Sequence, residues 1–133
     1  MEVSKRRLNG IRAVLGVGLF LALLYGISYL FFPKFMTPPG EAFTNTLEVV
    51  SREMGALLLT WAVAAGIALR DILRNLGLVL AGAITFGIMG LVMLYNHTFV
   101  AEITTAIDWV TIALLLILSV GLLILYPWRR VVS

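Results

Sequence analysis

The sequence predicts an all-α integral membrane protein, an antiparallel bundle of four transmembrane helices with both termini in the cytoplasm. The composition, four long apolar runs and an uneven distribution of basic residues lead to this fold class. Of the 133 residues, 61% are hydrophobic and 13% are charged, and the mean hydropathy is +1.03. A typical soluble domain is roughly 45–50% apolar and about 25% charged, and a small domain buries only part of its surface. We therefore expect lipid to cover much of this chain.

Four apolar runs are each long enough to cross about 30 Å of hydrocarbon as a helix. They cover about residues 11–32, 46–69, 76–95 and 109–126. The second helix is expected to begin near Thr46, because Asn45 is a suitable N-cap and Glu48 follows it three residues later. The connections between the runs are short, so residues 1–133 are predicted to form a single membrane domain.

The basic residues indicate the orientation of these helices. Eight of the ten Lys and Arg residues fall on one side of the predicted topology: Lys5, Arg6, Arg7, Arg12, Arg70, Arg74, Arg129 and Arg130. The positive-inside rule places that side, with both termini, in the cytoplasm. Anionic lipid of the inner leaflet then accounts for the net charge of +3, and no nucleic-acid partner is expected. The compact size and short loops are typical of a multi-pass protein of the prokaryotic cytoplasmic membrane.

Small residues predict where the helices pack, since close backbone approach drives helix association in lipid. The first three runs carry glycine and alanine at helical spacing, among them Gly18, Ala22, Gly26, Gly55, Ala62, Gly66, Gly77 and Ala81. The fourth run is bulky almost all round. We therefore expect the first three helices to form the packed centre and the fourth to face lipid or a partner subunit.

Several function classes find no support in the sequence. Proton relays and coupled transporters require ionisable residues within the membrane, and none lies near the middle of any predicted span. Neither a Ser-His-Asp arrangement, a phosphate-binding glycine loop nor a zinc motif is present, and the chain has no cysteine. We predict no catalytic residue, no metal site and no enzyme activity of the chain on its own.

Three residues within the membrane form a candidate site for an apolar ligand. Trp61 lies near the middle of the second span, where its indole N–H needs an acceptor, and Thr85 lies at a similar depth on the third span. Together with Tyr25 they would line a cavity for a bound lipid, quinone or carotenoid, although the chain is predicted to have no cofactor of its own. The alternative is ordinary helix packing with one hydrogen bond between Trp61 and Thr85.

A second group of polar residues lies at the outer membrane edge. Glu48 and Arg52 have the i, i+4 spacing of a helix ion pair, and Glu53 follows at the point of membrane entry, where burial would make it an acid or base. An external polar cluster is therefore predicted from Glu48, Arg52, Glu53, His97, Glu102 and Asp108. The spacing matches no metal motif, and a solvated rim is the alternative.

The second span also suggests a family. The stretch Ser51–Leu59 follows a first helix that ends in Phe-Pro, and its Arg52, Gly55 and Ala56 match an Arg-x-x-Gly-(Ala/Gly)-Leu-Leu pattern. In this it resembles the DoxX-like small four-helix membrane proteins. The resemblance implies the four-helix fold and, from some members of that family, an association with quinone-linked oxidoreductases.

The sequence leads to one function and two alternatives. We expect a non-catalytic accessory or structural subunit that packs against a larger membrane protein complex and holds lipid or pigment there, with membrane lipids and either a protein partner or a second copy around it. The first alternative is a small carrier or binding protein for an apolar ligand such as a quinone. The second is a DoxX-like component linked to a quinone oxidoreductase, as the resemblance implies.

Overall fold

The computed structural model describes residues 3–101 and 104–128. These residues form four long helices, α1 (Lys5–Phe31), α2 (Asn45–Arg70), α3 (Leu76–Tyr95) and α4 (Ala106–Leu125), and two short ones, η1 (Pro33–Met36) and η2 (Asn96–Val100). No strand is present in the described ranges. The four long helices, with η2 extending α3, are each long and apolar enough to cross a membrane. For the described residues, the predicted all-α class with four helices long and apolar enough to span a membrane is confirmed, as expected of a multi-pass membrane protein.

The helix ends follow from local capping. The α1 helix begins well before its apolar run because the Ser4 hydroxyl accepts a hydrogen bond from Arg7 N at 3.3 Å. The predicted N-cap of α2 is wrong by one residue: Thr44 caps this helix by accepting from Leu47 N at 3.2 Å, and Asn45 is already helical. The α3 helix covers the predicted residues 76–95.

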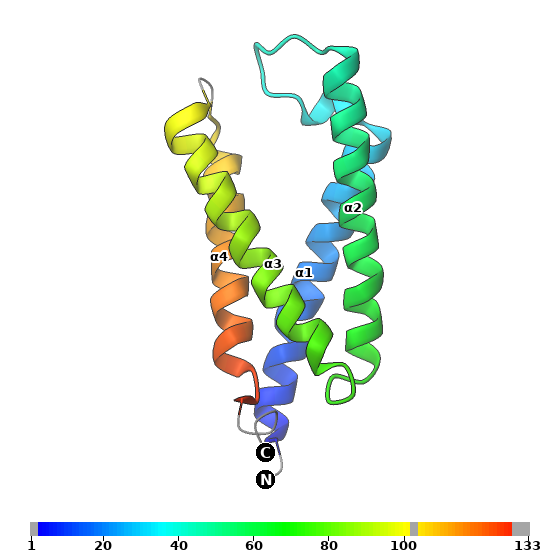
Figure 1. Ribbon diagram of the computed structural model, residues 1–133, viewed down its shortest axis with the longest axis vertical. Coiled ribbons are helices and arrows are strands. Elements are labelled where there is room, and N and C mark those ends of the chain that lie inside the picture. The colour runs from blue at the N-terminus through cyan, green and yellow to red at the C-terminus, as the bar shows by residue number, and fades with distance from the viewer. Residues whose placement is uncertain (1–2, 102–103, 129–133) are drawn as a thin grey trace.

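The four helices form two hairpins, α1 with α2 and α3 with α4 (Figure 1). Within the first hairpin, Gly18 lies against Trp61 and Gly26 lies against Gly55, so residue numbers rise along α1 as they fall along α2. Within the second hairpin, residue numbers likewise rise along α3 as they fall along α4. Gly87 lies against Ser119, and Gly90 lies against Leu116.

The hydrophobic core that joins the two hairpins occupies only one half of the molecule. Its buried residues are Ile11, Leu15, Ala68, Ile72, Val79, Ala83, Phe86, Leu115, Leu118, Leu122 and Tyr126. These belong to the half in which α1 begins and α4 ends, and the hairpins diverge toward the other end (Figure 1). We call these the inner and outer halves.

The sequence-based expectation of a packed centre made by the first three helices is wrong. The fourth helix contributes three leucines to the core, because one face of this bulky helix fits the small residues of α3. Conversely, Gly66 and Gly77 are not packing positions, since a Cβ added at either would meet no atom within 4 Å. Small residues therefore marked only some of the helix contacts.

Candidate functional site: an outer polar network

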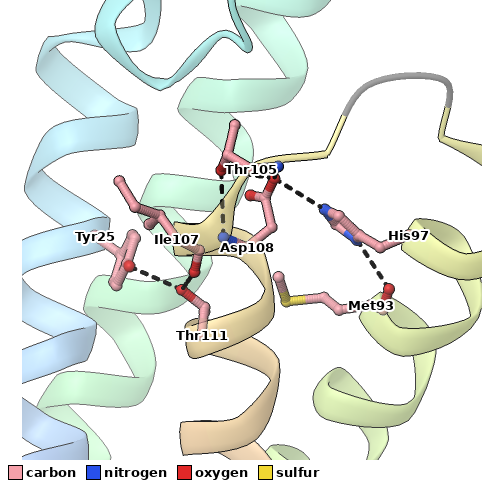
Figure 2. Close-up of polar contacts among 7 residues, drawn as sticks. All are labelled: Tyr25, Met93, His97, Thr105, Ile107, Asp108 and Thr111. Atoms are coloured by element: carbon pink, nitrogen blue, oxygen red, sulfur yellow. Dashed lines mark hydrogen bonds and ion pairs between the residues drawn. The ribbon is translucent and has the colours of Figure 1, made fainter.

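Polar side chains from three elements form two separate sets of contacts in the outer half (Figure 2). One set joins Tyr25 to Thr111, and the other joins His97, Asp108 and Thr105. We call the two sets together the outer polar network. Tyr25 comes from α1, His97 from η2, and the other three from the start of α4 or the residue before it. The outer polar network lies where the two hairpins have diverged. Its contacts join α1 to α4 through Tyr25 and Thr111, and η2 to α4 through His97 and Asp108.

Asp108 is held in place by the start of α4. Its carboxylate accepts hydrogen bonds from the backbone N–H and the hydroxyl of Thr105, at 2.8 and 3.0 Å. Thr105 in turn accepts from the backbone N–H of Asp108 at 3.4 Å, which completes a capping box. A carboxylate at a helix N-terminus also interacts favourably with the helix dipole. This local stabilisation explains why α4 begins before its apolar run.

His97 lies between the end of α3 and Asp108. Its Nδ1 lies 2.9 Å from the Met93 carbonyl oxygen, and because a carbonyl can only accept, Nδ1 carries a hydrogen. The Nε2 atom lies 3.6 Å from the Asp108 carboxylate. That contact becomes an attractive N–H to carboxylate pair only when the ring is protonated. The π-helical turn of η2, in which Ala101 N donates to Asn96 O at 2.7 Å, is what turns His97 toward α4.

Tyr25 and Thr111 connect α1 to α4 through a hydrogen bond of 3.0 Å between their hydroxyl oxygens. The hydroxyl of Thr111 also donates to the carbonyl oxygen of Ile107 at 2.8 Å. A threonine hydroxyl has one hydrogen, so Tyr25 must be the donor and Thr111 the acceptor in the bond between the helices. The ring of Tyr25 is further supported by Tyr29, whose ring centroid lies 6.5 Å away.

Trp61 has different neighbours from those predicted. Its ring packs against Phe86 of α3 with a centroid distance of 4.6 Å, and it lies against Gly18 of α1 and Gly82 of α3. No hydrogen bond between Trp61 and Thr85 is present among the described residues; the Thr85 hydroxyl donates to Ala81 O of its own helix at 2.8 Å. The three residues of the predicted apolar site are thus not joined to one another by hydrogen bonds.

The structure divides the predicted external polar cluster into two groups. Arg52 donates to Glu48 at 2.6 Å within α2, which confirms the predicted i, i+4 pair, and Glu53 beside it is exposed. His97 and Asp108 form the other group on the α3–α4 hairpin, away from the start of α2 (Figure 1). Glu102 lies outside the described residues. Glu53 is not covered by the other helices of the chain, so its burial at the point of membrane entry stays a prediction.

Sequence reasoning missed two contacts between helices, those of Thr111 with Tyr25 and of Phe86 with Trp61. Thr111 is a polar residue within the apolar run of the fourth helix, and that position could have indicated a hydrogen bond to another helix. Phe86 carried no such signal, because an aromatic residue in an apolar run is typical of any membrane helix. Within the part of the chain described, no three His, Cys, Asp or Glu side chains are grouped so as to hold a metal ion.

Comparisons with known proteins leave the function to be argued from this geometry. Neither a protein-family model, a curated protein nor a solved structure matches the chain. The resemblance to DoxX-like proteins therefore stays a prediction. In the structure, Gly55 of that motif lies at the closest approach of α1 and α2, which gives the glycine a packing role.

Proposed function

We propose that the chain is an antiparallel four-helix subunit of the prokaryotic cytoplasmic membrane, with both termini in the cytoplasm, and that it packs against a larger membrane protein without catalysing a reaction itself. The opposite order of the contacts within each hairpin supports the antiparallel arrangement. The positive-inside rule supports the orientation, since six of the eight basic residues that the structure describes belong to the end at which α1 begins and α2 ends.

The exposed face of α4 is the observation that carries the accessory role. Along this face run four β-branched residues, Val110, Ile117, Val120 and Ile124, with exposed fractions from 54% to 68%. They recur at helical spacing and so form one continuous ridge. Because β-branched side chains are already restricted in a helix, they lose little side-chain entropy when another helix packs on them. The low entropy cost favours an apolar transmembrane helix of a partner, rather than fluid lipid, as the surface that covers this ridge.

Site-specific photocrosslinking in native membranes tests this proposal. A photoreactive residue replaces Ile117 or Ile124 on the ridge, and Val63, an equally exposed residue of α2 at 65%, is the matched control. We expect both ridge positions, but not the control, to crosslink one membrane protein that also co-purifies stoichiometrically in mild detergent. Crosslinking to a second copy of the chain would indicate a homo-oligomer instead. A lone monomer without stoichiometric partners would overturn the accessory role.

The environment of Trp61 supports a second candidate, a small binding protein for an apolar ligand such as a lipid, quinone or carotenoid. Its indole N–H has no hydrogen-bond partner among the described residues, whereas every fully buried side-chain N or O atom of those residues has one. The Trp61 N–H is therefore not fully buried within the chain, and it could donate a hydrogen bond to an acceptor on a ligand. Tyr25 and Thr85 would line the same site from α1 and α3.

Native mass spectrometry distinguishes this second candidate. Wild-type protein should retain a small molecule that Trp61→Ala loses, whereas Trp61→Phe should keep the aromatic contact with Phe86 and weaken retention less. An empty wild-type protein would remove the candidate. The DoxX-like, quinone-linked role makes a separate prediction: substitution of both Arg52 and Glu53 by Gln should lower the turnover of the holo-complex, and unchanged turnover would contradict it.

A further inference from the structure

The two hairpins are held together unequally along their length. In the inner half, residues of all four helices or their connecting turn share one core. In the outer half, each hairpin keeps its own close contacts, Gly26 with Gly55 in the first and Gly90 with Leu116 in the second. The buried core residues include none from the outer half of α1 or α2, and from that part of the two helices only the partly buried Leu21 of α1 packs against them. The hairpins diverge there (Figure 1).

One hydrogen bond connects the hairpins in this outer half. Among the residues that the structure describes, two side-chain hydrogen bonds join one hairpin to the other. Asn75 bonds to Ile67 O at 3.5 Å beside the turn that links α2 to α3 in the inner half, and Tyr25 bonds to Thr111 in the outer half. The ion pairs of the same residues each lie within a single hairpin.

We propose that the hydrogen bond between Tyr25 and Thr111 is a latch that holds the outer halves of the hairpins together. When it breaks, the α1–α2 hairpin pivots against the α3–α4 hairpin about the inner core, and the outer half opens. The inference goes beyond the accessory role, which requires no motion. The latch is weak enough to open reversibly, because one hydrogen bond between helices in a membrane shifts an equilibrium by only about threefold on average.

Both partners are positioned for such a latch. The Thr111 hydroxyl is oriented by its bond to Ile107 O in α4, and it therefore presents a lone pair toward α1 (Figure 2). Tyr25 reaches it from a half-buried position beside Tyr29. Loss of the Tyr25 hydroxyl leaves the contacts within both hairpins unchanged, so opening can proceed without unfolding either one.

Distance measurements between spin labels test the latch, and the absence of native cysteine makes the labelling specific. Full-length protein in lipid nanodiscs carries an outer pair of labels through Val50→Cys and Val92→Cys, which are 51% and 52% exposed. An inner pair uses Ile67→Cys and Leu78→Cys. Each pair is measured in the wild-type background and with Tyr25→Phe, Thr111→Val or the double substitution. Thr85→Val is the matched control, because that hydroxyl bonds only within its own helix.

We expect Tyr25→Phe and Thr111→Val each to raise the open fraction of the outer pair about threefold, with no change in the inner pair. The double substitution should open the outer half no further than either single one, since both remove the same bond. Three outcomes would overturn the latch: an unchanged outer pair, an equal effect of Thr85→Val, or a change in the inner pair, which would make the bond a support of the whole fold.

Discussion

Gly26 and Gly55 bring the backbones of α1 and α2 into direct contact. A Cβ added at Gly55 would lie 2.7 Å from the carbonyl oxygen of Gly26 and 2.6 Å from the backbone N of Leu30. Both atoms belong to the backbone of α1, so no side-chain rearrangement can make room. We predict that Gly55→Ala forces the two helices apart and lowers the free energy of unfolding by about 1–3 kcal/mol.

The matched control for Gly55 is Gly66 of the same helix, where an added Cβ would meet nothing within 4 Å. Gly66→Ala should be neutral or slightly stabilising, because alanine has the higher helix propensity. Unfolding by denaturing detergent, followed by circular dichroism, compares the two variants. Equal stabilities would show that α1 and α2 do not cross closely at Gly55.

The contact between Gly87 and Ser119 predicts a compensating pair of substitutions. A Cβ at Gly87 would lie 2.8 Å from Ser119 Oγ, which itself donates to the carbonyl oxygen of Ala83 at 2.7 Å. Gly87→Ala should therefore destabilise the α3–α4 hairpin by displacing that hydroxyl. In a Ser119→Ala background the same change should cost less, since the next nearest atom is Ser119 Cβ at 3.7 Å. Purely additive effects in a double-mutant cycle would contradict this contact.

Asp108 should matter more for the start of α4 than its neighbour His97 does. Asp108→Ala removes the acceptor of both bonds that Thr105 donates, and with it the N3 half of the capping box, whereas the Thr105 hydroxyl can still accept from the backbone N–H of residue 108. His97→Gln leaves that cap in place. We expect faster amide hydrogen exchange in the first turn of α4 for Asp108→Ala, and little change there for His97→Gln. The reverse order would mean that the pair with His97, and not the cap, orders the turn.

The proposed orientation predicts which ends react with a thiol reagent that does not cross membranes. Thr37→Cys, in the loop after α1, should be labelled in intact cells or spheroplasts. Arg74→Cys, in the turn between α2 and α3, should be labelled only after permeabilisation. The wild-type chain supplies no background because it has no cysteine. Labelling of Arg74→Cys in intact cells would invert the topology.

The bounds of the helices were largely predictable from the sequence. Apolar runs and the residues that interrupt them determine where a membrane helix can lie, so residues 76–95 were predicted as α3 shows them. Capping accounts for the rest: the Thr105 and Asp108 pair starts α4 at Ala106, three residues before the predicted start at residue 109. Such signals are local, and they can be read without knowledge of the other helices.

The partners of individual side chains were much less predictable. In a helix that is apolar almost all round, the sequence does not determine which face turns inward, so Leu115 and Leu118 gave no sign that they enter the core. Trp61 was singled out by its depth in the membrane, but its contact with Phe86 depends on the rotation of both helices. The bond between Tyr25 and Thr111 spans 86 positions of the chain, and no local pattern encodes it.

The placement of the shared core in the inner half bears on how the protein is made. Membrane insertion proceeds from the N-terminus, and α1 and α2 meet through glycine contacts that need nothing from the later helices. This first hairpin can therefore insert and pair while the second is still being synthesised. Assembly then ends when the second hairpin docks at the inner half, where the side chains of Ile11, Val79 and Leu122 belong to one core.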